Sequence, residues 1–378
     1  MIPLLLFVLR RSVFFKIPDK EIRILFKKIL VKIQNHLSCH TRVFQNTPPK
    51  STNMKRLKKI LKWTGVTILS IVIVFVIIVF ALQNKKFDAP FPNLHATNDS
   101  AIIARGKYLA YGPAHCSGCH TPAADQQKVI NGEEIPFKGG LEFALPIGKL
   151  YSKNITPDDE TGIGKVADSV LARSLRYGVA RDGRALFDFM PFHNLSDEDL
   201  IAVLSFLRAQ PAVKNEVPDN RLNFMGKAVK AFLIKPVGPD GEVSKSVSQD
   251  TTVEYGKYLA HYVTNCKGCH TNRSLMTGAY TGPEFAGGLK LEATDGSYCI
   301  TPNLTPDKET GRMTTWTEEQ FIARFRVKKA IPTSDMPWDQ FRKMSDNDLK
   351  AIYKYLRSLG PIKNDTGPTY VAGRTTKK

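Results

Sequence analysis

The chain has 378 residues, of which 42% are hydrophobic, 24% charged and 10% aromatic. This composition excludes a disordered or collagen-like protein, and the length is enough for two domains of ordinary size. Lys and Arg number 54 against 35 Asp and Glu, which gives a formal net charge of +19.

The positive charge is concentrated at the N-terminus. Residues 1–62 contain 15 Lys and Arg and two acidic residues, a net charge of +13, whereas the other 316 residues carry 39 against 33, a net charge of +6. A nucleic-acid-binding protein would carry its excess of basic residues on a folded binding surface. We therefore predict no nucleic-acid partner, and interpret residues 1–62 as a basic cytoplasmic segment.

The start of the chain is open to two interpretations. Residues 1–53 are apolar and basic by turns, as in an amphipathic helix that lies on an anionic membrane surface. The alternative, which we favour, is that translation starts at Met54, because MKRLKKILKW is a well-formed start of an export signal. Cys39 and His40 fall before Met54 and receive no functional role.

Residues 63–82 predict a single transmembrane helix. The sequence WTGVTILSIVIVFVIIVFAL has no charged residue, and twenty residues are enough to cross a bilayer. The basic residues before it outnumber Lys85 and Lys86 after it, so the positive-inside rule leaves the N-terminus in the cytoplasm. A cleaved signal peptide is the alternative, but the apolar run is longer than a typical signal core. We predict a single-pass protein of the inner (cytoplasmic) membrane, with the rest of the chain on the periplasmic side.

An internal repeat organises the chain after this segment. GKYLAYGPAHCSGCHT at 106–121 returns as GKYLAHYVTNCKGCHT at 256–271, and further motif pairs follow at offsets of 148 to 150 residues. These pairs are FKGGL with FAGGL, NITPDDETG with NLTPDKETG, and two Leu-rich segments that begin LSDEDL and MSDNDL. Two copies of one domain explain this order. We predict domain 1 at 98–215, an inter-domain helix and linker at 216–250, domain 2 at 251–366 and a tail at 367–378.

Each copy is predicted to be mainly helical. Ser196 and Ser345 are suitable N-caps, and the acidic residues after them complement the helix dipole. Apolar residues then recur at helical spacing in both closing segments, at Leu200, Val203, Leu204 and Leu207, and at Leu349, Ile352, Tyr353 and Leu356. Thr317 to Gln320 forms a capping box for a middle helix. LNFMGKAVKAFLIK, in the segment between the domains, has near-helical apolar spacing, and we expect it to pack between the domains. No large sheet is expected.

Two C-x-x-C-H motifs indicate the chemistry. Cys116, Cys119 and His120 form the first motif, and Cys266, Cys269 and His270 form the second. In c-type haem attachment the two thiols add to the porphyrin vinyl groups and the adjacent histidine coordinates the iron. We therefore predict two covalently bound haem c groups.

Three other uses of these motifs are less consistent with the sequence. A zinc site needs further Cys or His ligands at fixed spacing, yet Cys299 is the only other cysteine in either domain, with Leu150 at the counterpart position. A thioredoxin-like dithiol follows a strand, whereas here the motif follows a helical segment. Two structural disulfides would leave His120 and His270 unexplained. Haem attachment is favoured over all three.

Methionines are predicted as the second axial ligands. Met190 is the only methionine of copy one between the haem motif and the closing helix, and Met336 shares its Met-Pro-aromatic setting in copy two. A methionine ligand raises the potential of a haem and blocks its sixth position. The other methionines of copy two, Met276, Met313 and Met344, are interpreted as core residues.

Three histidines near these motifs have no counterpart in the other copy. His193 follows Met190 and is a rival ligand, but the corresponding part of copy two has no histidine, so we expect it on the surface. His115 and His261 flank the haem motifs, and we assign no function to either.

Together these motifs resemble two tandem class I cytochrome c domains behind a single N-terminal transmembrane helix. In that class the glycine corresponding to Gly106 lets the first helix cross the last one against an aromatic residue, here Phe206, with Tyr355 in copy two. The N-[IL]-T-P-D-x-E-T-G and S-D-[EN]-D-L signatures are similar to those of cytochrome c subunits of membrane-bound alcohol, aldehyde and gluconate dehydrogenases. The chain departs from them in having two domains rather than three.

The resemblance implies an electron carrier rather than an enzyme. Its partners would be redox proteins, such as a dehydrogenase catalytic subunit or a quinol-oxidising enzyme on one side and a terminal oxidase on the other. The alternative is a di-haem cytochrome c peroxidase, in which one iron would have an open sixth position. A haem-based sensor is a third interpretation, and it would need an open ligand site or a signalling domain.

Overall fold

The computed structural model describes residues 54–373, except residues 275–277, 294, 328 and 332–333. The chain divides into two compact units, Met1–Phe75 and Val76–Lys378. The predictions for residues 1–53, including Cys39 and His40, and for Met276 lie outside the described residues.

Helix α3 (Met54–Leu82) contains the predicted transmembrane segment. It ends at Leu82 as predicted and begins before Trp63, because the Lys- and Leu-rich sequence after Met54 consists of good helix formers. Its part from Arg56 to Leu82 is long and apolar enough to cross a membrane, by length and composition. Most of the apolar side chains along α3 are exposed, as lipid-facing side chains would be.

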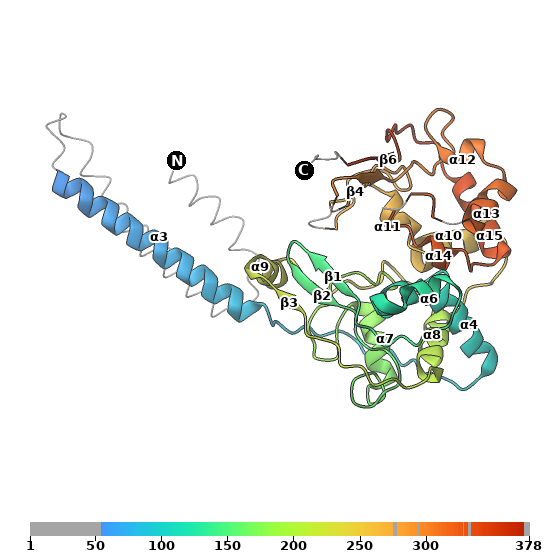
Figure 1. Cartoon of the computed structure of the whole chain (residues 1–378), viewed down its shortest axis with the longest axis horizontal. Coiled ribbons are helices and arrows are strands. Elements are labelled where there is room, and N and C mark those ends of the chain that lie inside the picture. Colours follow the sequence, from blue (N-terminus) through green and yellow to red (C-terminus); the bar gives the residue numbers. More distant parts are fainter. Residues whose placement is uncertain (1–53, 275–277, 294, 328, 332–333, 374–378) are drawn as a thin grey trace. The chain divides into compact units, whose positions relative to one another are not determined.

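The first repeat folds into short helices around a small sheet (Figure 1). Its elements are α4 (Ser100–Tyr111), α5 (Cys116–His120), η2 (Ala123–Asp125), α6 (Gln126–Ile130), β1 (Glu142–Leu145), β2 (Gly148–Tyr151), α7 (Asp168–Tyr177) and α8 (Asp197–Ala209). They are followed by β3 (Arg221–Leu222) and α9 (Phe224–Phe232).

The second repeat has the same order of main elements. It contains α10 (Val253–Tyr258), the π-helical turn η3 (Leu259–Val263), α11 (Cys266–His270), β4 (Lys290–Glu292), β5 (Tyr298–Ile300), α12 (Arg312–Thr315), α13 (Glu318–Arg326), α14 (Trp338–Phe341), α15 (Asp346–Ser358) and β6 (Tyr370–Val371). The predicted capping box at Thr317 is present, and the side chains of Ser196 and Ser345 accept hydrogen bonds as N-caps of α8 and α15. The helix-rich fold confirms the prediction of a mainly α protein.

Two glycines allow the first and last helices of each repeat to cross closely. A methyl group at Gly106 in α4 would come within 1.8 Å of the Ala202 carbonyl oxygen and 2.9 Å of Phe206 Cβ in α8. Gly256 in α10 would meet Ala351 of α15 at 1.9 Å in the same way. Because no side chain intervenes, the two helix backbones are in direct contact, as the resemblance implied.

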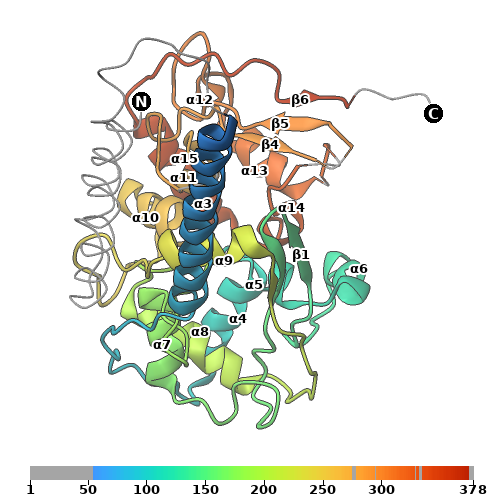
Figure 2. The ribbon, with the colours of Figure 1, turned by 90° about the vertical axis from the view of Figure 1, so that its left-hand side faces the viewer.

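Each repeat carries one three-stranded antiparallel sheet. The strand orders are β1-β2-β3 and β4-β5-β6, and the second sheet is seen clearly in Figure 2. In each sheet the third strand follows the closing helix and pairs with the middle strand, so residues 221–222 and 370–371 complete the sheets from beyond the closing helices. Cys299 and Leu150 are buried at corresponding positions in the middle strands.

The buried apolar residues of both repeats form one continuous core. This cluster includes Leu109, Phe137 and Leu204 from the first repeat and Leu259, Phe285 and Leu349 from the second. Methionines 313 and 344 belong to it, which confirms their interpretation as core residues. The second unit is therefore held together across the repeats by apolar packing.

Helix α9 packs against the first repeat. Gly226 is its buried residue, and a methyl group there would meet the carbonyl oxygen of Ile147, between β1 and β2, at 2.1 Å. The helix therefore lies against the β1–β2 turn of the first repeat, because Gly226 permits close contact there. Its expected packing between the repeats stays a prediction.

Candidate functional site

The two C-x-x-C-H motifs form the short helices α5 and α11. Each helix is preceded by a residue in the left-handed conformation, His115 with φ 43° and Asn265 with φ 53°. This conformation is uncommon for residues with a side chain, and it turns the chain sharply after the preceding helix. The single helical turn that follows places the two cysteines of each motif close together, with the histidine directly after them.

The motif cysteines are unpaired, half-buried thiols. None of the four forms a disulfide. Burial raises the pKa of Cys116 to about 12 and that of Cys266 to about 11, and it raises the pKa of Cys119 and Cys269 as well. The thiols are therefore neutral near pH 7 and are protected from ready oxidation, which depends on thiolate formation.

Each motif histidine is oriented through one ring nitrogen. Nδ1 of His120 is 2.8 Å from the Lys153 carbonyl oxygen, and Nδ1 of His270 is 3.1 Å from the Pro302 carbonyl oxygen. A carbonyl can only accept, so Nδ1 carries the proton, and burial lowers the pKa of both imidazoles. Among the described residues nothing hydrogen-bonds to Nε2 of either ring. A neutral imidazole with a free Nε2 is the form that coordinates a metal.

The repeated Gly-Gly motif brings the accepting carbonyl close to each histidine. Gly139 has φ 68°, donates its N–H to the His120 carbonyl oxygen at 2.8 Å, and leaves no room for a side chain beside Lys153. Gly287 has φ 73° and donates in the same way to His270 at 2.8 Å. Glycine is needed here because both the positive φ and the close approach exclude a Cβ.

The repeated N-x-T signature holds the residue after each accepting carbonyl. Asn154 donates to the Val213 carbonyl oxygen at 2.8 Å and its own side-chain oxygen accepts from Thr156. Asn303 makes the equivalent bond to the carbonyl oxygen of Ile362 at 2.7 Å. Both asparagines are buried, so these bonds fix the loop that presents the carbonyl to the histidine.

The predicted methionine ligands lie in corresponding loops. Met190 follows α7 and precedes α8, and Met336 follows α13 and precedes α14. Both are half-buried and pack against the core that also contacts Cys116 and Cys266. The assignment of Met190 and Met336 as iron ligands stays a prediction.

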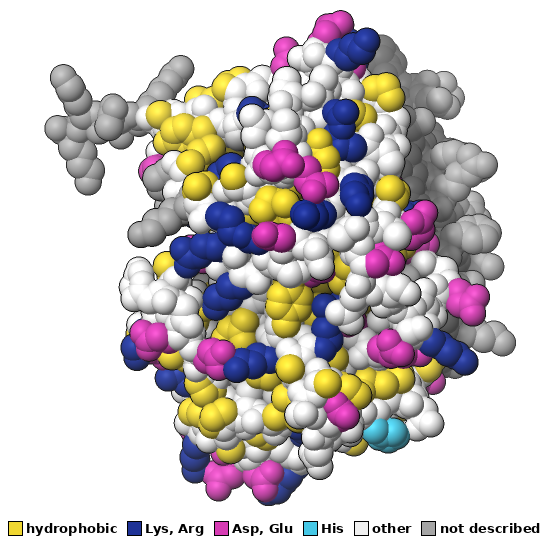
Figure 3. All heavy atoms as spheres, turned by 90° about the vertical axis from the view of Figure 1, so that its right-hand side faces the viewer, with side chains coloured by type: hydrophobic (Ala, Val, Ile, Leu, Met, Phe, Trp, Pro, Cys, Tyr) yellow, Lys and Arg dark blue, Asp and Glu magenta, His cyan; other side chains and the backbone are white. Residues whose placement is uncertain are grey.

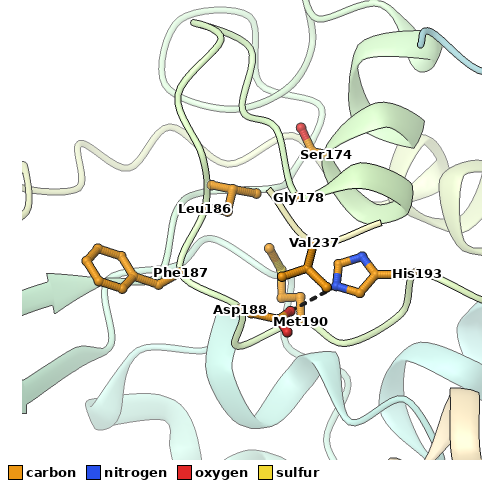
Figure 4. Close-up of a pocket in the computed structure, with 8 residues that line it drawn as sticks. All are labelled: Ser174, Gly178, Leu186, Phe187, Asp188, Met190, His193 and Val237. Atoms are coloured by element: carbon orange, nitrogen blue, oxygen red, sulfur yellow. Dashed lines mark hydrogen bonds and ion pairs between the residues drawn. The ribbon is translucent and has the colours of Figure 1, made fainter. Parts of the chain in front are cut away.

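His193 is buried, with a relative exposure of 8%, which corrects the expectation of a surface residue. Its two ring nitrogens are occupied: Nδ1 lies 3.0 Å from the Leu175 carbonyl oxygen and Nε2 lies 2.9 Å from Asp188 Oδ1. Figure 4 shows this pair beside Met190, with Val237 closing the small pocket. Because neither nitrogen is free, His193 is poorly suited to be a ligand and instead braces the Met190 loop.

Reciprocal hydrogen bonds join the two repeats. The hydroxyl of Tyr108 in α4 donates to Asp348 Oδ2 at 2.6 Å and accepts from the backbone N–H of Ser345 at 2.9 Å. Asp348 and Ser345 form the start of α15 in the second repeat. Burial, and then the negative charge of Asp348, raise the pKa of Tyr108 beyond its ordinary range, so its hydroxyl remains a donor.

The second repeat makes the equivalent contact with the first repeat. The hydroxyl of Tyr258 donates to Asp199 Oδ2 at 2.7 Å and accepts from the backbone N–H of Ser196 at 3.1 Å, both at the start of α8. Tyr258 is the counterpart of Tyr108 and Asp199 that of Asp348. Such an exchange, in which each repeat gives what it receives, is the pattern of a two-fold interface.

Arg105 also contributes to the contact between the repeats. It forms an ion pair with the buried Asp199 at 2.8 Å and lies 3.4 Å from the hydroxyl of Tyr255, its own counterpart in the second repeat. Tyr255 in turn donates to Asp348 at 3.1 Å. The two buried carboxylates are thus each bonded from both repeats, which offsets the cost of burying their charge.

The first haem motif also contacts the second repeat. The His115 ring lies 6.2 Å from Phe192 and 5.7 Å from Phe341 between centroids, so it packs between an aromatic residue of each repeat. A methyl group at Gly118 would be 3.3 Å from the Gln340 side chain of α14. Helix α14 therefore rests on α5, and His115, to which no role was assigned, is part of the contact.

The sequence patterns do not reveal these interface residues. Tyr108, Tyr258, Asp199 and Asp348 recur in both repeats, and the acidic pair was attributed to helix dipoles alone. The available signal is a tyrosine that recurs in the first helix of each repeat and an aspartate that recurs in each closing helix. This signal does not indicate that each tyrosine bonds to the aspartate of the other repeat.

The donor set of each motif fits haem c. Two half-buried thiols precede an imidazole whose Nε2 is free and whose Nδ1 is held by a backbone carbonyl. Among the residues that the structure describes, no group of three or more His, Cys, Asp or Glu side chains is placed to hold a metal ion by itself.

No known protein-family model matches the chain. It is 30% identical over 309 residues to the cytochrome c subunit of a quinone alcohol dehydrogenase from Gluconobacter oxydans, which covers 76% of this chain and 61% of the relative. It is also 30% identical over 277 residues to the gluconate 2-dehydrogenase cytochrome c subunit of Pantoea cypripedii, covering 69% and 60%.

A shorter relative matches over more of its own length. The diheme cytochrome c-type protein of Cereibacter sphaeroides is 25% identical over 261 residues, which are 65% of this chain and 82% of the relative. The chain spans about three-fifths of the length of the two dehydrogenase subunits. These names imply haem c as the cofactor, and the chain thus resembles the cytochrome c subunits of alcohol and gluconate dehydrogenases and a di-haem cytochrome c.

Proposed function

We propose that the chain is a membrane-anchored di-haem cytochrome c that transfers electrons between a dehydrogenase or quinol-oxidising partner and a respiratory acceptor. The observation that carries the proposal is the double occurrence of one arrangement. In each repeat a half-buried histidine follows two half-buried thiols and leaves Nε2 free, because Nδ1 is bonded to a carbonyl. The printed names of the relatives support the same role.

Corresponding residues of the two repeats would have the same roles in binding haem. Cys116 and Cys119 would hold one haem covalently with His120 and Met190 as axial ligands, and Cys266 and Cys269 would hold the second with His270 and Met336. Bound haem c would supply a one-electron iron couple. The carbonyls of Lys153 and Pro302 keep the proton on Nδ1 of each histidine.

Helix α3 supports a membrane location for the protein. Its apolar run and the basic residues that precede it support a single-pass anchor in the inner (cytoplasmic) membrane, with both repeats on the periplasmic side. Haem attachment to the cysteines also requires export of the repeats.

A partner protein would meet a surface of mixed charge. On the face in Figure 3, basic and acidic side chains are interspersed and apolar side chains lie between them. Such a surface supports recognition by matched local charges rather than by a single strong field. A dehydrogenase catalytic subunit is the partner that the relatives' names favour.

The test is a haem count and a spectrum on the purified full chain. We expect two haem c groups per chain, a far-red methionine-to-iron band in the oxidised form, and no turnover of hydrogen peroxide. Five-coordinate high-spin iron that turns over peroxide would replace the carrier with a di-haem peroxidase. Purification from detergent extracts should identify the partner, because a dehydrogenase subunit that co-purifies would name the electron donor.

A further inference from the structure

Helix α9 has several exposed apolar side chains. Met225 is 63% exposed and Leu233 52%, and Val237, after the helix, is 40% exposed. Phe224 and Phe232, at the two ends of α9, are exposed as well. So many exposed large apolar residues in one short segment are unusual on a protein that meets only water.

The opposite side of α9 is fixed to the first repeat. Gly226 packs on the carbonyl of Ile147, and Asn223 caps the helix by accepting from the N–H of Gly226 at 2.9 Å. The Asn223 side chain also donates to the Pro146 carbonyl oxygen at 2.8 Å. These bonds hold the helix on the β1–β2 turn, so its apolar residues are kept on the outside.

Lysines of α9 lie beside the end of the predicted transmembrane helix. The Lys227 ammonium stands 4.6 Å from the ring centroid of Phe80, and the Lys230 ammonium is 3.3 Å from Asn84 Oδ1. Phe80 is two residues before the end of α3 at Leu82, which is about 3 Å along the helix axis. Helix α9 is therefore level with the end of the apolar run, where the headgroup layer of a bilayer begins.

Basic residues surround Lys230, together with one acidic residue. Burial, and then the charge of Arg184, lower the pKa of Lys230, and Asp182, which pairs with Arg184 at 2.9 Å, has the opposite effect. Arg184 pairs by its backbone with Lys86, which follows the end of α3, and Lys235 follows α9. Positive charge thus borders the apolar residues of α9 on the side of the anchor.

We propose that α9 and the segment up to Val237 lie in the membrane interface, with the apolar residues among the upper acyl chains and Lys227, Lys230 and Lys235 on anionic lipid headgroups. An amphipathic helix of this kind sits about 5–10 Å deep at the boundary between headgroups and acyl chains. The contact would fix the first repeat at the membrane surface. This inference rests on the proposed anchoring by α3.

A lipid surface is favoured over a protein partner for two reasons. The patch is continuous with the end of a helix that is itself apolar enough to cross a membrane, so the two surfaces can enter one bilayer. The charges that border it are of the sign that anionic headgroups attract, and basic residues near a membrane surface strengthen such contacts.

The test is photo-crosslinking of the full-length holoprotein in vesicles that contain a lipid with a diazirine in its acyl chain. Peptides are then mapped by mass spectrometry. We expect label on peptides from 63–82 and from 224–237. Changing Met225→Glu and Leu233→Glu together should reduce the label on 224–237 about tenfold, because a carboxylate is excluded from the apolar layer. The label on 63–82 should stay.

The matched control is Val327→Glu, which places a carboxylate at a site 52% exposed in the second repeat. It should leave the label on 224–237 unchanged. Vesicles with phosphatidylglycerol should give more label on 224–237 than vesicles of phosphatidylcholine alone, and equal labelling would overturn the role given to the lysines.

The outcomes separate the two proposals. Label on 63–82 without label on 224–237 in the unmodified protein would overturn the inference and leave the anchor in place. Absence of label on 63–82 would overturn the anchor, and label on 224–237 in that case would still support membrane contact by α9.

Discussion

Two methionines near the second haem motif have opposite environments. Met336 is half-buried in a loop, whereas Met344 is 3% exposed, belongs to the core and precedes the N-cap of α15. The sequence separated them only by the Met-Pro-aromatic context. The structure adds that Met344 is fully engaged in packing, so the two should respond differently to truncation.

Met336→Ala should remove the far-red methionine-to-iron band of one haem and lower its potential, because the ligand that stabilises reduced iron is lost. Met344→Ala should keep the band and lower the free energy of unfolding by about 2–5 kcal/mol, the usual cost of truncating a buried methionine. Visible spectra and denaturant titrations distinguish the two. If both variants keep the band, Met336 is not the ligand.

His261 gives the protein a predictable response to acid. Its Nε2 lies 2.6 Å from the Tyr355 hydroxyl and its ring packs on Phe285. Burial, and then the charge of Lys267, lower its pKa from 6.5 to about 4. Between pH 4 and pH 6.5 the folded protein therefore binds fewer protons at His261 than the unfolded chain does. Above pH 6.5 His261 is neutral in both states, so its burial does not lower the free energy of unfolding there.

The stability that depends on neutral His261 is complete above pH 6.5 and is lost as the pH falls toward 4. We expect a loss of about 1–2 kcal/mol between pH 7 and pH 4.5, less than the full shift would give because the ring is partly exposed. His261→Phe keeps the ring packing and should flatten this part of the pH profile in urea titrations. The exposed His95 is the matched control, and His95→Phe should leave the profile unchanged. An equally steep profile in His261→Phe would exclude this source.

At the scale of elements, the sequence predicted those helices whose signals are local. The caps at Ser196, Ser345 and Thr317 and the apolar spacing after them specified α8, α15 and α13, because caps and periodicity act within a few residues. The two small sheets were not located. Their third strands, β3 and β6, are two residues long and pair with strands far earlier in the chain. They are too short to show an alternating apolar pattern in the sequence.

The crossing of α4 on α8 provides a sharp test of an element-level prediction. Gly106→Ala should lower the free energy of unfolding by about 3 kcal/mol or more, because the added methyl would overlap the Ala202 carbonyl oxygen at 1.8 Å and force the helices apart. Gly256→Ala should do the same in the second repeat. Gly360→Ala is the control, because nothing lies within 4 Å of its position and its φ is not positive. A mild effect at Gly106 would mean that the helices can separate cheaply.

At the scale of the whole molecule, the repeats could be predicted from the sequence but their docking could not. Self-similarity shows that two units share one plan, and it carries no information on which surfaces meet. Tyr108 and Asp348 are 240 residues apart, and each has a local interpretation, as a helix residue and as an acid near a helix start. The two C-x-x-C-H motifs could be recognised for the opposite reason, since each consists of five consecutive residues.

The two-fold exchange of tyrosines makes the repeats interdependent in a measurable way. Tyr108→Phe removes a donor to the buried Asp348 and an acceptor for the Ser345 N–H, which should cost about 1–3 kcal/mol because buried polar groups lose a partner. Tyr258→Phe should cost a similar amount, since its contacts with the first repeat are equivalent.

Tyr151→Phe is the matched control, because the Tyr151 hydroxyl donates to the exposed Glu142 within one sheet, and its loss should change stability by less than about 0.5 kcal/mol. Denaturant unfolding followed at both haems should show one shared transition in the unmodified protein. The double variant Tyr108→Phe with Tyr258→Phe should separate this into two transitions, because the reciprocal tyrosine hydrogen bonds are gone while each repeat keeps its own helix crossing. A single transition with full stability in the double variant would show that these two tyrosines do not couple the repeats.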